Sequence, residues 1–427
     1  KDVPDRVFIN SAVCEGCGDC SVKSNCLAVV PKETELGRKR QIDQAACNKD
    51  YSCTNGFCPS FVTVSGGQLR KNKAADSAVE FPVLPQPLFP TLDRPWNILA
   101  TGVGGTGVLT VTSVLSMAAH LEGKGVATLN QTGLAQKFGP ITGHLRIAKN
   151  QEDIHAVRIP AGDADLLIGC DLIVSAMDDA LAKLNVERSY AVINETLSPT
   201  AEFVKNPDAV FHDEEMKQSI CDELAEDRVS FLPATEIASA LLGDTIATNF
   251  FMLGYAYQKG LVPVGEEAIY KALELNGVQV AFNQQAFLWG RRTVVDQREV
   301  ERIAGIHDKR FTALESLDEL VAYRSDDLVL YQDQAYADAF VQQVNLVKQA
   351  EAALKDGENF LLTNAVAKSL YKVMAYKDEY EVARLFTNGK FQQELQDKFE
   401  GDYSLSFHLA PPLFSKKDPS TGHLRKV

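Results

Sequence analysis

The chain has 427 residues, of which 45% are hydrophobic and 23% are charged, and its formal net charge is −14. This length and apolar content predict two or three globular domains with full-sized cores and exclude a disordered chain. The acidic balance argues against nucleic acid as a partner. Since no apolar run reaches about 18 residues, the length that a membrane span requires, we expect no membrane insertion and a cytoplasmic location.

Seven of the nine cysteines lie within the first 58 residues. Cys14, Cys17 and Cys20 are spaced CxxCxxC, which lets one short loop direct three thiolates at a single inorganic core. Cys58 is followed by Pro59, the ending of a ferredoxin cysteine run, whose last cysteine binds the cluster of the other run. We therefore predict a 4Fe–4S cluster held by Cys14, Cys17, Cys20 and Cys58.

The other three cysteines of this segment predict a second cluster. Cys47 and Cys53 frame a second run in which Asp50 stands in place of the middle cysteine, and Cys26 remains from the first run. A carboxylate oxygen is a harder ligand than a thiolate and binds iron less well. A site of Cys26, Cys47, Cys53 and Asp50 is therefore expected to lose iron readily and to leave a 3Fe–4S core. The alternative for Asp50 is a solvated aspartate beside a degenerate site.

Other uses of these cysteines fit the sequence less well. Zinc suits paired CxxC knuckles, but a CxxCxxC triplet places three sulfurs on one knuckle, and seven cysteines divide badly into tetrads. Disulfides would need an oxidising compartment and an even count, and the sequence shows no segment fit for a signal peptide. The isolated Cys170 and Cys221 are interpreted as a core residue and a helix residue.

The sequence after the cysteines predicts a linker and two further regions. Five of the 17 prolines fall within residues 82–95, and this density blocks helices and favours extended conformations. We therefore predict a ferredoxin-like iron–sulfur module at residues 1–72, a Pro-rich linker at 73–95, and an α/β domain at 96–296. Residues 297–427 show helical periodicity and predict a helical C-terminal region.

The α/β domain opens with a glycine-rich turn. An apolar run from Asn97 precedes the turn, and residues 108–121 are suited to a buried helix. Strand, glycine turn and helix together bring backbone amides and a helix N-terminus to an anion in nucleotide-binding folds. The next strand, at 125–129, lacks the terminal acid that would hold a dinucleotide ribose, so NAD is not expected. The candidate cofactor-binding residues are Gly102, Gly104, Gly105, Thr106 and Gly107.

Further strands and helices alternate along the domain. Strands are predicted at 164–169, 190–194 and 229–233, and helices follow up to 259, so we expect a mostly parallel sheet covered by helices. Residues 129–146 are predicted to form a loop at the carboxyl end of the second strand, where such sheets bind ligands. That loop would hold Lys137, His144 and Arg146 either as ligand contacts or as solvated charges.

Together these residues resemble the fused bacterial indolepyruvate ferredoxin oxidoreductases, a branch of the 2-oxoacid:ferredoxin oxidoreductases. In the cysteine-rich part, the resemblance rests on residues 14–20, 24–26, 37–40, 42–44, 47–53 and 56–61. In the α/β part, it rests on the glycine turn and on residues 249–254 and 283–287. It implies a Rossmann-like gamma domain for residues 96–296, and the extra C-terminal domain of the fused enzymes for the helical tail.

The resemblance also implies an activity. In such enzymes thiamine diphosphate attacks a 2-oxo acid, carbon dioxide leaves, two electrons pass through iron–sulfur clusters to ferredoxin, and the acyl group goes to coenzyme A. The thiamine and magnesium site needs a GDG run followed by paired asparagines, whereas this chain has only Gly243-Asp244-Thr245. The thiamine domains are therefore expected upstream or in a partner chain. No catalytic residue is assigned to this chain.

The implied partners are ferredoxin, the thiamine-binding domains of the same enzyme and a further copy of the chain. The glycine turn is expected to face coenzyme A or the neighbouring thiamine domain. Two rival functions remain. One is a stand-alone iron–sulfur electron-transfer protein whose Rossmann-like domain is not catalytic, and the other is a nucleotide-dependent reductase, against which the missing ribose acid counts.

Overall fold

Tertiary contacts in the computed structural model divide the chain into two units. Unit 1 comprises Lys1–Asp43, Asn48–Gln68 and Arg310–Val427, and unit 2 comprises Gln44–Cys47 and Leu69–Lys309. Unit 1 thus joins the cysteine-rich segment to the C-terminal region, which is distant in sequence. The structure describes residues 4–26, 28–70, 81–132, 139–197, 206, 212–306, 316–354, 359–410, 415–417, 419, 422 and 426.

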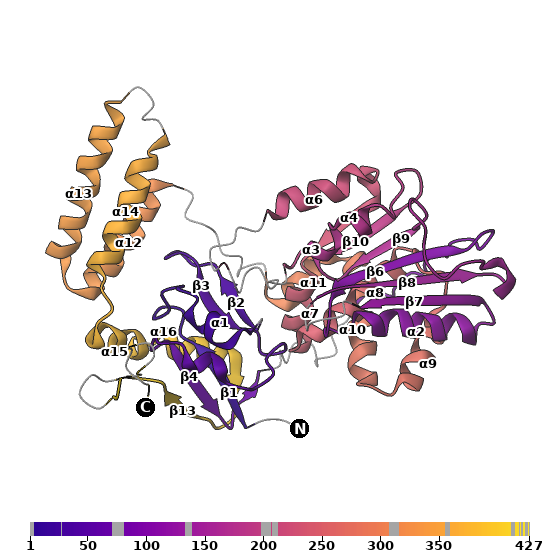
Figure 1. Cartoon of the computed structure of the whole chain (residues 1–427), viewed down its shortest axis with the longest axis horizontal. Helices are drawn as coiled ribbons and strands as arrows, with labels where there is room; N and C mark the ends of the chain where they lie inside the picture. The colour runs from indigo at the N-terminus through magenta and orange to yellow at the C-terminus, as the bar shows by residue number, and fades with distance from the viewer. Residues whose placement is uncertain are drawn as a thin grey trace. The chain divides into compact units, whose positions relative to one another are not determined.

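Unit 1 contains a three-stranded sheet built from both ends of the sequence. Strand β4 (Phe61–Ser65) pairs antiparallel with β1 (Asp5–Ile9) on one edge and with β13 (Ser404–Phe407) on the other, as Figure 1 shows in indigo and yellow. Strands β2 (Val29–Lys32) and β3 (Lys39–Ile42) form a separate antiparallel pair. The remaining short elements of the cysteine-rich segment are α1 (Asp19–Ser24), the 3₁₀ helix η1 (Ser52–Asn55) and β5 (Gln68–Leu69).

The C-terminal region is helical, as the periodicity predicts, but it also contributes strands. Ser316 and Glu319 form a capping box that starts the first helix, and Phe340 and Val344 lie in the core between the helices. The four residues of β13 are too few to show the alternation by which a strand is recognised. The elements are α12 (Leu317–Tyr331), α13 (Gln334–Ala352), α14 (Leu361–Met374), α15 (Glu379–Thr387), α16 (Lys390–Lys398), β12 (Phe399–Glu400) and β13.

Side chains of the C-terminal region complete the core beneath β1. The ring of Phe8 lies 6.1 Å from that of Phe391 and 6.2 Å from that of Phe399, between centroids. The Asn10 amide donates to the Leu385 carbonyl oxygen over 3.1 Å. Because buried aromatic pairs of this kind dominate small cores, the cysteine-rich segment and the C-terminal region form one folded unit.

Unit 2 is built on a six-stranded sheet in the order β11-β10-β9-β6-β8-β7. The first four strands of this order run parallel, whereas β8 is antiparallel to both β6 and β7. The prediction of a parallel-rich α/β fold is therefore confirmed. The strands are β6 (Trp96–Val103), β7 (Gly125–Thr132), β8 (Pro140–Ala148), β9 (Leu166–Gly169), β10 (Tyr190–Asn194) and β11 (Val229–Leu232).

The predicted loop over residues 129–146 is wrong. Strand β7 continues through Thr132, and β8 occupies 140–148, so His144 and Arg146 lie on a strand. Along β8, His144 and Arg146 alternate with the buried Leu145 and Ile147, which is the period-two pattern of a strand. The glycine and polar residues of the segment, which are also typical of loops, led to the wrong prediction. Lys137 lies outside the described residues.

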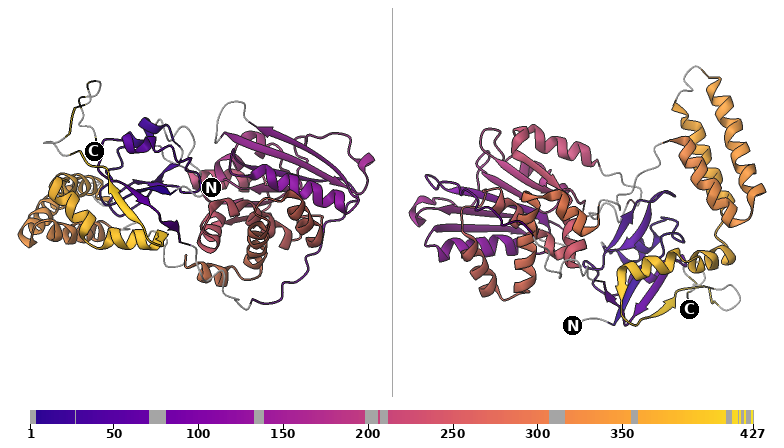
Figure 2. Two further views of the ribbon diagram at one scale, coloured as in Figure 1. Left: turned by 90° about the horizontal axis from the view of Figure 1, so that it is seen from below. Right: turned by 180° about the vertical axis from the view of Figure 1, so that it is seen from behind.

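Helices cover both faces of this sheet (Figure 2). Ile98 and Ala100 of β6 pack in one cluster with the helices α2 and α8, while Leu99 packs in the other with α3 and α6. Two short helices, α3 and α4, follow β9. The helices are α2 (Val108–Leu121), α3 (Leu172–Ser175), α4 (Asp178–Leu181), α6 (Asp213–Asp222), α7 (Ala234–Leu242), α8 (Thr248–Gln258), α9 (Glu266–Asn276), α10 (Val280–Val295) and α11 (Gln297–Ala304).

Residues 81–95, the described part of the predicted linker, carry no helix or strand and lie along unit 2. The Gln258 side chain donates to the Pro85 carbonyl oxygen over 2.6 Å, and the ring of Phe89 lies 5.7 Å from that of Tyr257. Arg94 pairs with the buried carboxylate of Asp165. Across the parts of the chain that the structure describes, no helix combines the length and the apolar character that a membrane crossing requires.

Candidate metal centre and glycine turn

Two glycines shape the loop that carries Cys14, Cys17 and Cys20. Gly16 has φ 73° and Gly18 has φ 76°, conformations that glycine adopts without steric cost. The Gly16 N–H donates to the Cys14 sulfur over 3.3 Å. A Cβ on Gly16 would overlap the carbonyl oxygen of Arg38, so the loop lies directly on the chain that leads into β3.

Close packing around Gly56 brings the segment of Cys58 to the first cysteine run. A Cβ on Gly56 would lie only 3.0 Å from the Cα of Cys20. The adjacent Phe57 N–H donates to the Asp19 carboxylate over 2.9 Å. These contacts hold the Cys-Pro ending of the second run against α1, the arrangement that a shared first cluster requires.

Burial and nearby thiols raise the pKa of three cysteines of this set. Burial, and then the negative charges of Cys58, Cys14 and Cys17, raise the pKa of Cys20 to about 12. Burial and then Cys58 likewise raise the pKa of Cys14 and that of Cys17, although backbone N–H groups oppose the shift. Four thiolates so placed repel one another, and a positively charged core between them would relieve that repulsion.

The donor set fits an iron–sulfur cluster. In the part of the chain that the structure describes, no three His, Cys, Asp or Glu side chains are placed to share a single metal ion. Each thiolate of a 4Fe–4S cluster binds a different iron, so its ligands stand farther apart than those around one ion. Cys58 is near enough to raise the pKa of Cys14, Cys17 and Cys20, and the assignment of all four as ligands stays a prediction.

The predicted second set is less clearly defined. Cys53 is buried in η1, whereas Cys26 and Cys47 are half-buried. Asp50 is exposed, and its carboxylate accepts hydrogen bonds from the Ser52 N–H over 3.0 Å and from the Ser52 hydroxyl over 2.8 Å. This is a turn-forming role for an aspartate, which favours the surface alternative that the sequence leaves open. Ligation by Asp50 stays a prediction.

The glycine turn links β6 to α2, and its glycines have different roles. A Cβ on Gly102 would lie 2.6 Å from Cγ2 of Val108, and one on Gly104 would lie 3.3 Å from the carbonyl oxygen of Gly139. These two glycines therefore permit close packing within unit 2. Gly105, with φ 88°, faces open space. Gly107, with φ 91°, precedes α2, whose N-terminus no side chain caps.

Thr106 helps to hold the turn. Its hydroxyl donates to the Val103 carbonyl oxygen over 2.8 Å, and its own carbonyl oxygen accepts from the Asn249 side chain over 2.6 Å. The turn is thus fixed from both sides before any ligand binds.

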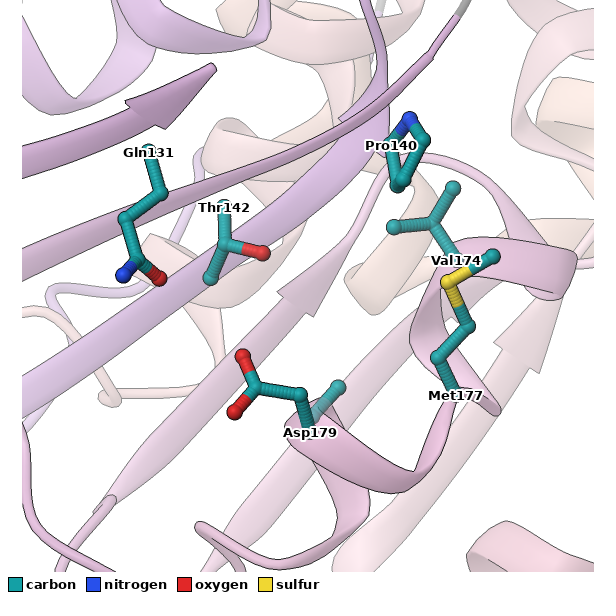
Figure 3. A pocket seen from close by; sticks show the side chains of 7 residues that line it. Gln131, Pro140, Thr142, Val174, Met177 and Asp179 are labelled. Carbon is teal, nitrogen blue, oxygen red and sulfur yellow. The ribbon is translucent and has the colours of Figure 1, made fainter. Parts of the chain in front are cut away.

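A cavity of about 270 Å³ lies at the same edge of the sheet as the turn, because its lining residue Pro140 pairs with Val103 at the end of β6. Figure 3 shows Gln131, Thr142 and Asp179 on one side of it, and apolar side chains on the other. Such a mixture of a few polar groups with apolar walls is typical of small-molecule sites. The lining residues are Gln131, Pro140, Thr142, Val174, Met177, Asp179 and Ala180.

His144 supports this cavity from within the sheet and was not predicted to do so. The side chain is fully buried. Its Nδ1 accepts the Ile159 N–H over 3.3 Å, so Nε2 carries the proton and donates to the Gln131 Oε1 over 3.2 Å. Burial, and then the charges of Lys183 and Arg158, lower the pKa of His144 from 6.5 to about 4. A neutral imidazole therefore orients Gln131.

This burial makes the stability of unit 2 depend on pH. Between pH 6.5 and 4 the unfolded chain binds a proton at His144 that the folded chain does not, so the stabilisation is complete above about pH 6.5 and is lost as the pH falls toward 4. We expect the free energy of unfolding of unit 2 to fall by an amount on the order of 3 kcal/mol over this pH range. Both tryptophans, Trp96 and Trp289, belong to unit 2, so urea unfolding followed by tryptophan fluorescence measures it.

Replacing His144 by glutamine should flatten this pH dependence. The control is His120→Gln, which removes an exposed histidine of α2. Equal slopes of stability against pH in the two variants would contradict the assignment.

The residues Gly243-Asp244-Thr245 do not fit thiamine diphosphate. Gly243, with φ 79°, ends α7. The Asp244 carboxylate accepts the Ile246 N–H over 3.0 Å and caps a 3₁₀ turn. Glycine and aspartate are common at such positions for conformational reasons alone.

Comparisons with known proteins place this fold in a family. Residues 97–293 match the model described as pyruvate ferredoxin/flavodoxin oxidoreductase, and residues 317–427 match a family of unknown function, DUF6537. The indolepyruvate oxidoreductase subunit IorB of Archaeoglobus fulgidus is 31% identical over 205 residues, which cover 44% of this chain and 94% of that protein. The subunit of the same name from Thermococcus kodakarensis is 24% identical and covers 43% and 87%.

Among solved structures, the pyruvate oxidoreductase subunit PORC of Thermotoga maritima is 21% identical, with a TM-score of 0.34, over 47% of this chain and 96% of that one. The sequence relatives confirm the resemblance noted from the glycine turn and the α/β segment. The chain therefore belongs to the pyruvate ferredoxin/flavodoxin oxidoreductase family, and within it to the indolepyruvate oxidoreductases.

Proposed function

We propose that this chain is the electron-exit and gamma portion of a thiamine-dependent 2-oxoacid:ferredoxin oxidoreductase of the indolepyruvate or arylpyruvate type. In this proposal the complete enzyme decarboxylates a 2-oxo acid oxidatively, forms an acyl-CoA and passes the electrons to ferredoxin. The thiamine-binding domains lie elsewhere in the enzyme and act with this chain as partners. Assembly with a further copy of the chain stays a prediction.

The observation that carries the proposal is the gathering of Cys14, Cys17, Cys20 and Cys58 in one unit of a chain from this family. Iron–sulfur clusters, when bound, accept and release single electrons. The protein supplies the thiolates, the Gly16 N–H directed at the Cys14 sulfur, and a buried setting that keeps Cys14 and Cys20 from solvent. Hydrogen bonds to sulfur and exclusion of water both affect the reduction potential.

The glycine turn and the adjacent cavity are proposed to serve coenzyme A. The uncapped N-terminus of α2 presents backbone N–H groups, which favour phosphate. Gly105 faces open space at the turn, so the backbone is accessible there. The Gln131 amide, held by His144, offers a polar contact in the cavity beside it.

Replacing Gly105 by alanine tests this role. The methyl group would project toward the ligand, and we expect coenzyme A affinity to fall at least about tenfold, or ~1.4 kcal/mol. Gly123→Ala is the matched control, because Gly123 has φ 71°, faces open space and lies beyond the other end of α2. Isothermal titration calorimetry measures both. Equal affinity in the two variants would remove the turn from the coenzyme A site.

The function is tested on the chain assembled with its thiamine-binding domains under strict anaerobiosis. Thiamine diphosphate, magnesium, coenzyme A and a panel of aromatic, branched and small 2-oxo acids are supplied with a viologen dye. We expect arylpyruvates to reduce the dye and the isolated chain to decarboxylate none of them, since its sequence has no GDG run followed by paired asparagines. Dye reduction by NADH or NADPH, with none from any 2-oxo acid, would favour the nucleotide-dependent reductase instead.

The iron content of anaerobically purified protein tests the clusters separately. About eight iron atoms per chain are expected with two 4Fe–4S clusters, and about seven if the second is a 3Fe–4S core. Four iron atoms with a single magnetic signal after reduction would leave Cys26, Cys47 and Cys53 as structural thiols.

A further inference from the structure

The C-terminal region, whose family has no known function, places a lysine beside the first cysteine set. Lys426 is half-buried, and its ammonium group donates to the Thr54 carbonyl oxygen over 3.0 Å. The same group lies 5.1 Å from the centroid of the Phe61 ring. Burial lowers the pKa of Lys426, while the negative charges of Cys58 and Cys20 oppose that shift. Thr54 and Phe61 stand on either side of Cys58 in the sequence, so these two contacts hold the ammonium group beside the segment that carries Cys58.

A second lysine of the C-terminal region lies beside the first cysteine run, which begins at Cys14. Lys377, between α14 and α15, forms an ion pair with Glu15. It also lies 3.4 Å from the Val13 carbonyl oxygen, to which it donates. Val13 and Glu15 flank Cys14 in the sequence. The C-terminal region thus delivers positive charge to both segments that carry the first cysteine set.

The cysteine-rich segment adds buried cations of its own. Arg40 is only 1% exposed and Lys39 only 6%. Arg40 experiences the negative charges of Cys20 and Cys14, which oppose the lowering of its pKa by burial. Burying cations is unfavourable unless negative charge compensates them. Four thiolates around an iron–sulfur core supply such charge, since the complex as a whole is anionic.

We propose that the C-terminal region, residues 317–427, is the electrostatic partner of the first iron–sulfur site, and that Lys426 is a positioned cation that raises its reduction potential. This inference rests on the proposed function. One-electron reduction adds a negative charge to the site, and a fixed cation nearby stabilises the reduced form more than the oxidised form. Lys377 acts in the same direction from the side of Cys14.

Redox titration of the full chain, followed by electron paramagnetic resonance, tests the role of Lys426. In Lys426→Met we expect the equilibrium constant for reduction of the first cluster to fall roughly tenfold, which is about 59 mV for one electron. Lys426→Arg keeps the charge and should restore the wild-type potential to within about twofold in that constant. Lys417→Met is the control, because Lys417 is an exposed lysine of the same segment. It should leave the potential unchanged.

The outcomes separate this inference from the function on which it rests. A wild-type chain without any iron–sulfur signal overturns the proposed function, and this inference with it. A wild-type cluster whose potential is the same in Lys426→Met overturns the inference alone. Equal shifts of the reduction potential in Lys426→Met and Lys426→Arg also overturn it, because the potential would then depend on the contacts of the lysine side chain and not on its charge. Should Lys426→Met fail to hold the cluster, Lys377→Met must lower the potential, and an unchanged value there overturns the inference.

Discussion

Replacing either Cys20 or Cys58 with alanine is expected to remove the same iron–sulfur cluster, although the two residues are 38 positions apart. Burial and then the charge of Cys58 raise the pKa of Cys20, and Gly56 packs the segment of Cys58 against Cys20. The iron content should fall by about four atoms per chain in each variant. The same magnetic signal should disappear from both after reduction with dithionite.

Two further variants complete this experiment. Cys53→Ala should remove the other signal and leave the first, because Cys53 is assigned to the second set. Cys221→Ala, in α6 of unit 2, should keep the full iron content and both signals. If Cys58→Ala lost the signal that Cys53→Ala loses, the exchange of the fourth cysteine between the two runs would be disproved.

Replacing Gly254 by alanine is expected to unfold unit 2 at a much lower urea concentration. Helices α8 and α10 cross where a Cβ on Gly254 would overlap the Phe287 carbonyl oxygen, and one on Gly290 would overlap that of Phe251. The obstacles are backbone atoms, so the helices themselves must separate. Since α8 is buried along its whole length, we expect the free energy of unfolding of unit 2 to fall by about 3 kcal/mol or more.

Tryptophan fluorescence during urea unfolding measures this loss, because Trp96 and Trp289 both belong to unit 2. The control is Gly265→Ala, where the new Cβ would meet the Glu122 carboxylate, the movable end of a side chain, at 2.9 Å. The free energy of unfolding of that variant should lie within about 1 kcal/mol of the wild-type value. Similar midpoints for the two variants would show that the helix crossing tolerates a methyl group.

Local patterns in the sequence predicted the elements whose causes are local. Helix α2 has the predicted bounds, residues 108–121, because an apolar stretch follows a glycine that can adopt positive φ. The spacing of the cysteines is likewise a local property, and the two metal-binding sets inferred from it stay predictions. Strand β8 was missed although Leu145 and Ile147 alternate with His144 and Arg146, because the glycine and polar residues of its segment are also typical of a loop.

Features that depend on distant parts of the chain could not be predicted in this way. Strand β13 pairs with β4 through Ser404 and Ser65, and nothing in either short segment identifies its partner. The cations beside the first cysteine set, Arg40 and Lys426, likewise look like ordinary surface charges in the sequence. Their significance comes from burial and from proximity in space, which only the folded structure reveals.

The two-part composition of unit 1 also bears on how the protein is made. Strand β4 leaves the ribosome about 340 residues before β13, its partner in the sheet. At a synthesis rate of roughly 5–20 residues per second, the cysteine-rich segment waits on the order of 20–70 seconds for the aromatic side chains that complete its core. On the proposed function, the first iron–sulfur site therefore gains its complete surrounding core only once the C-terminal region has been made.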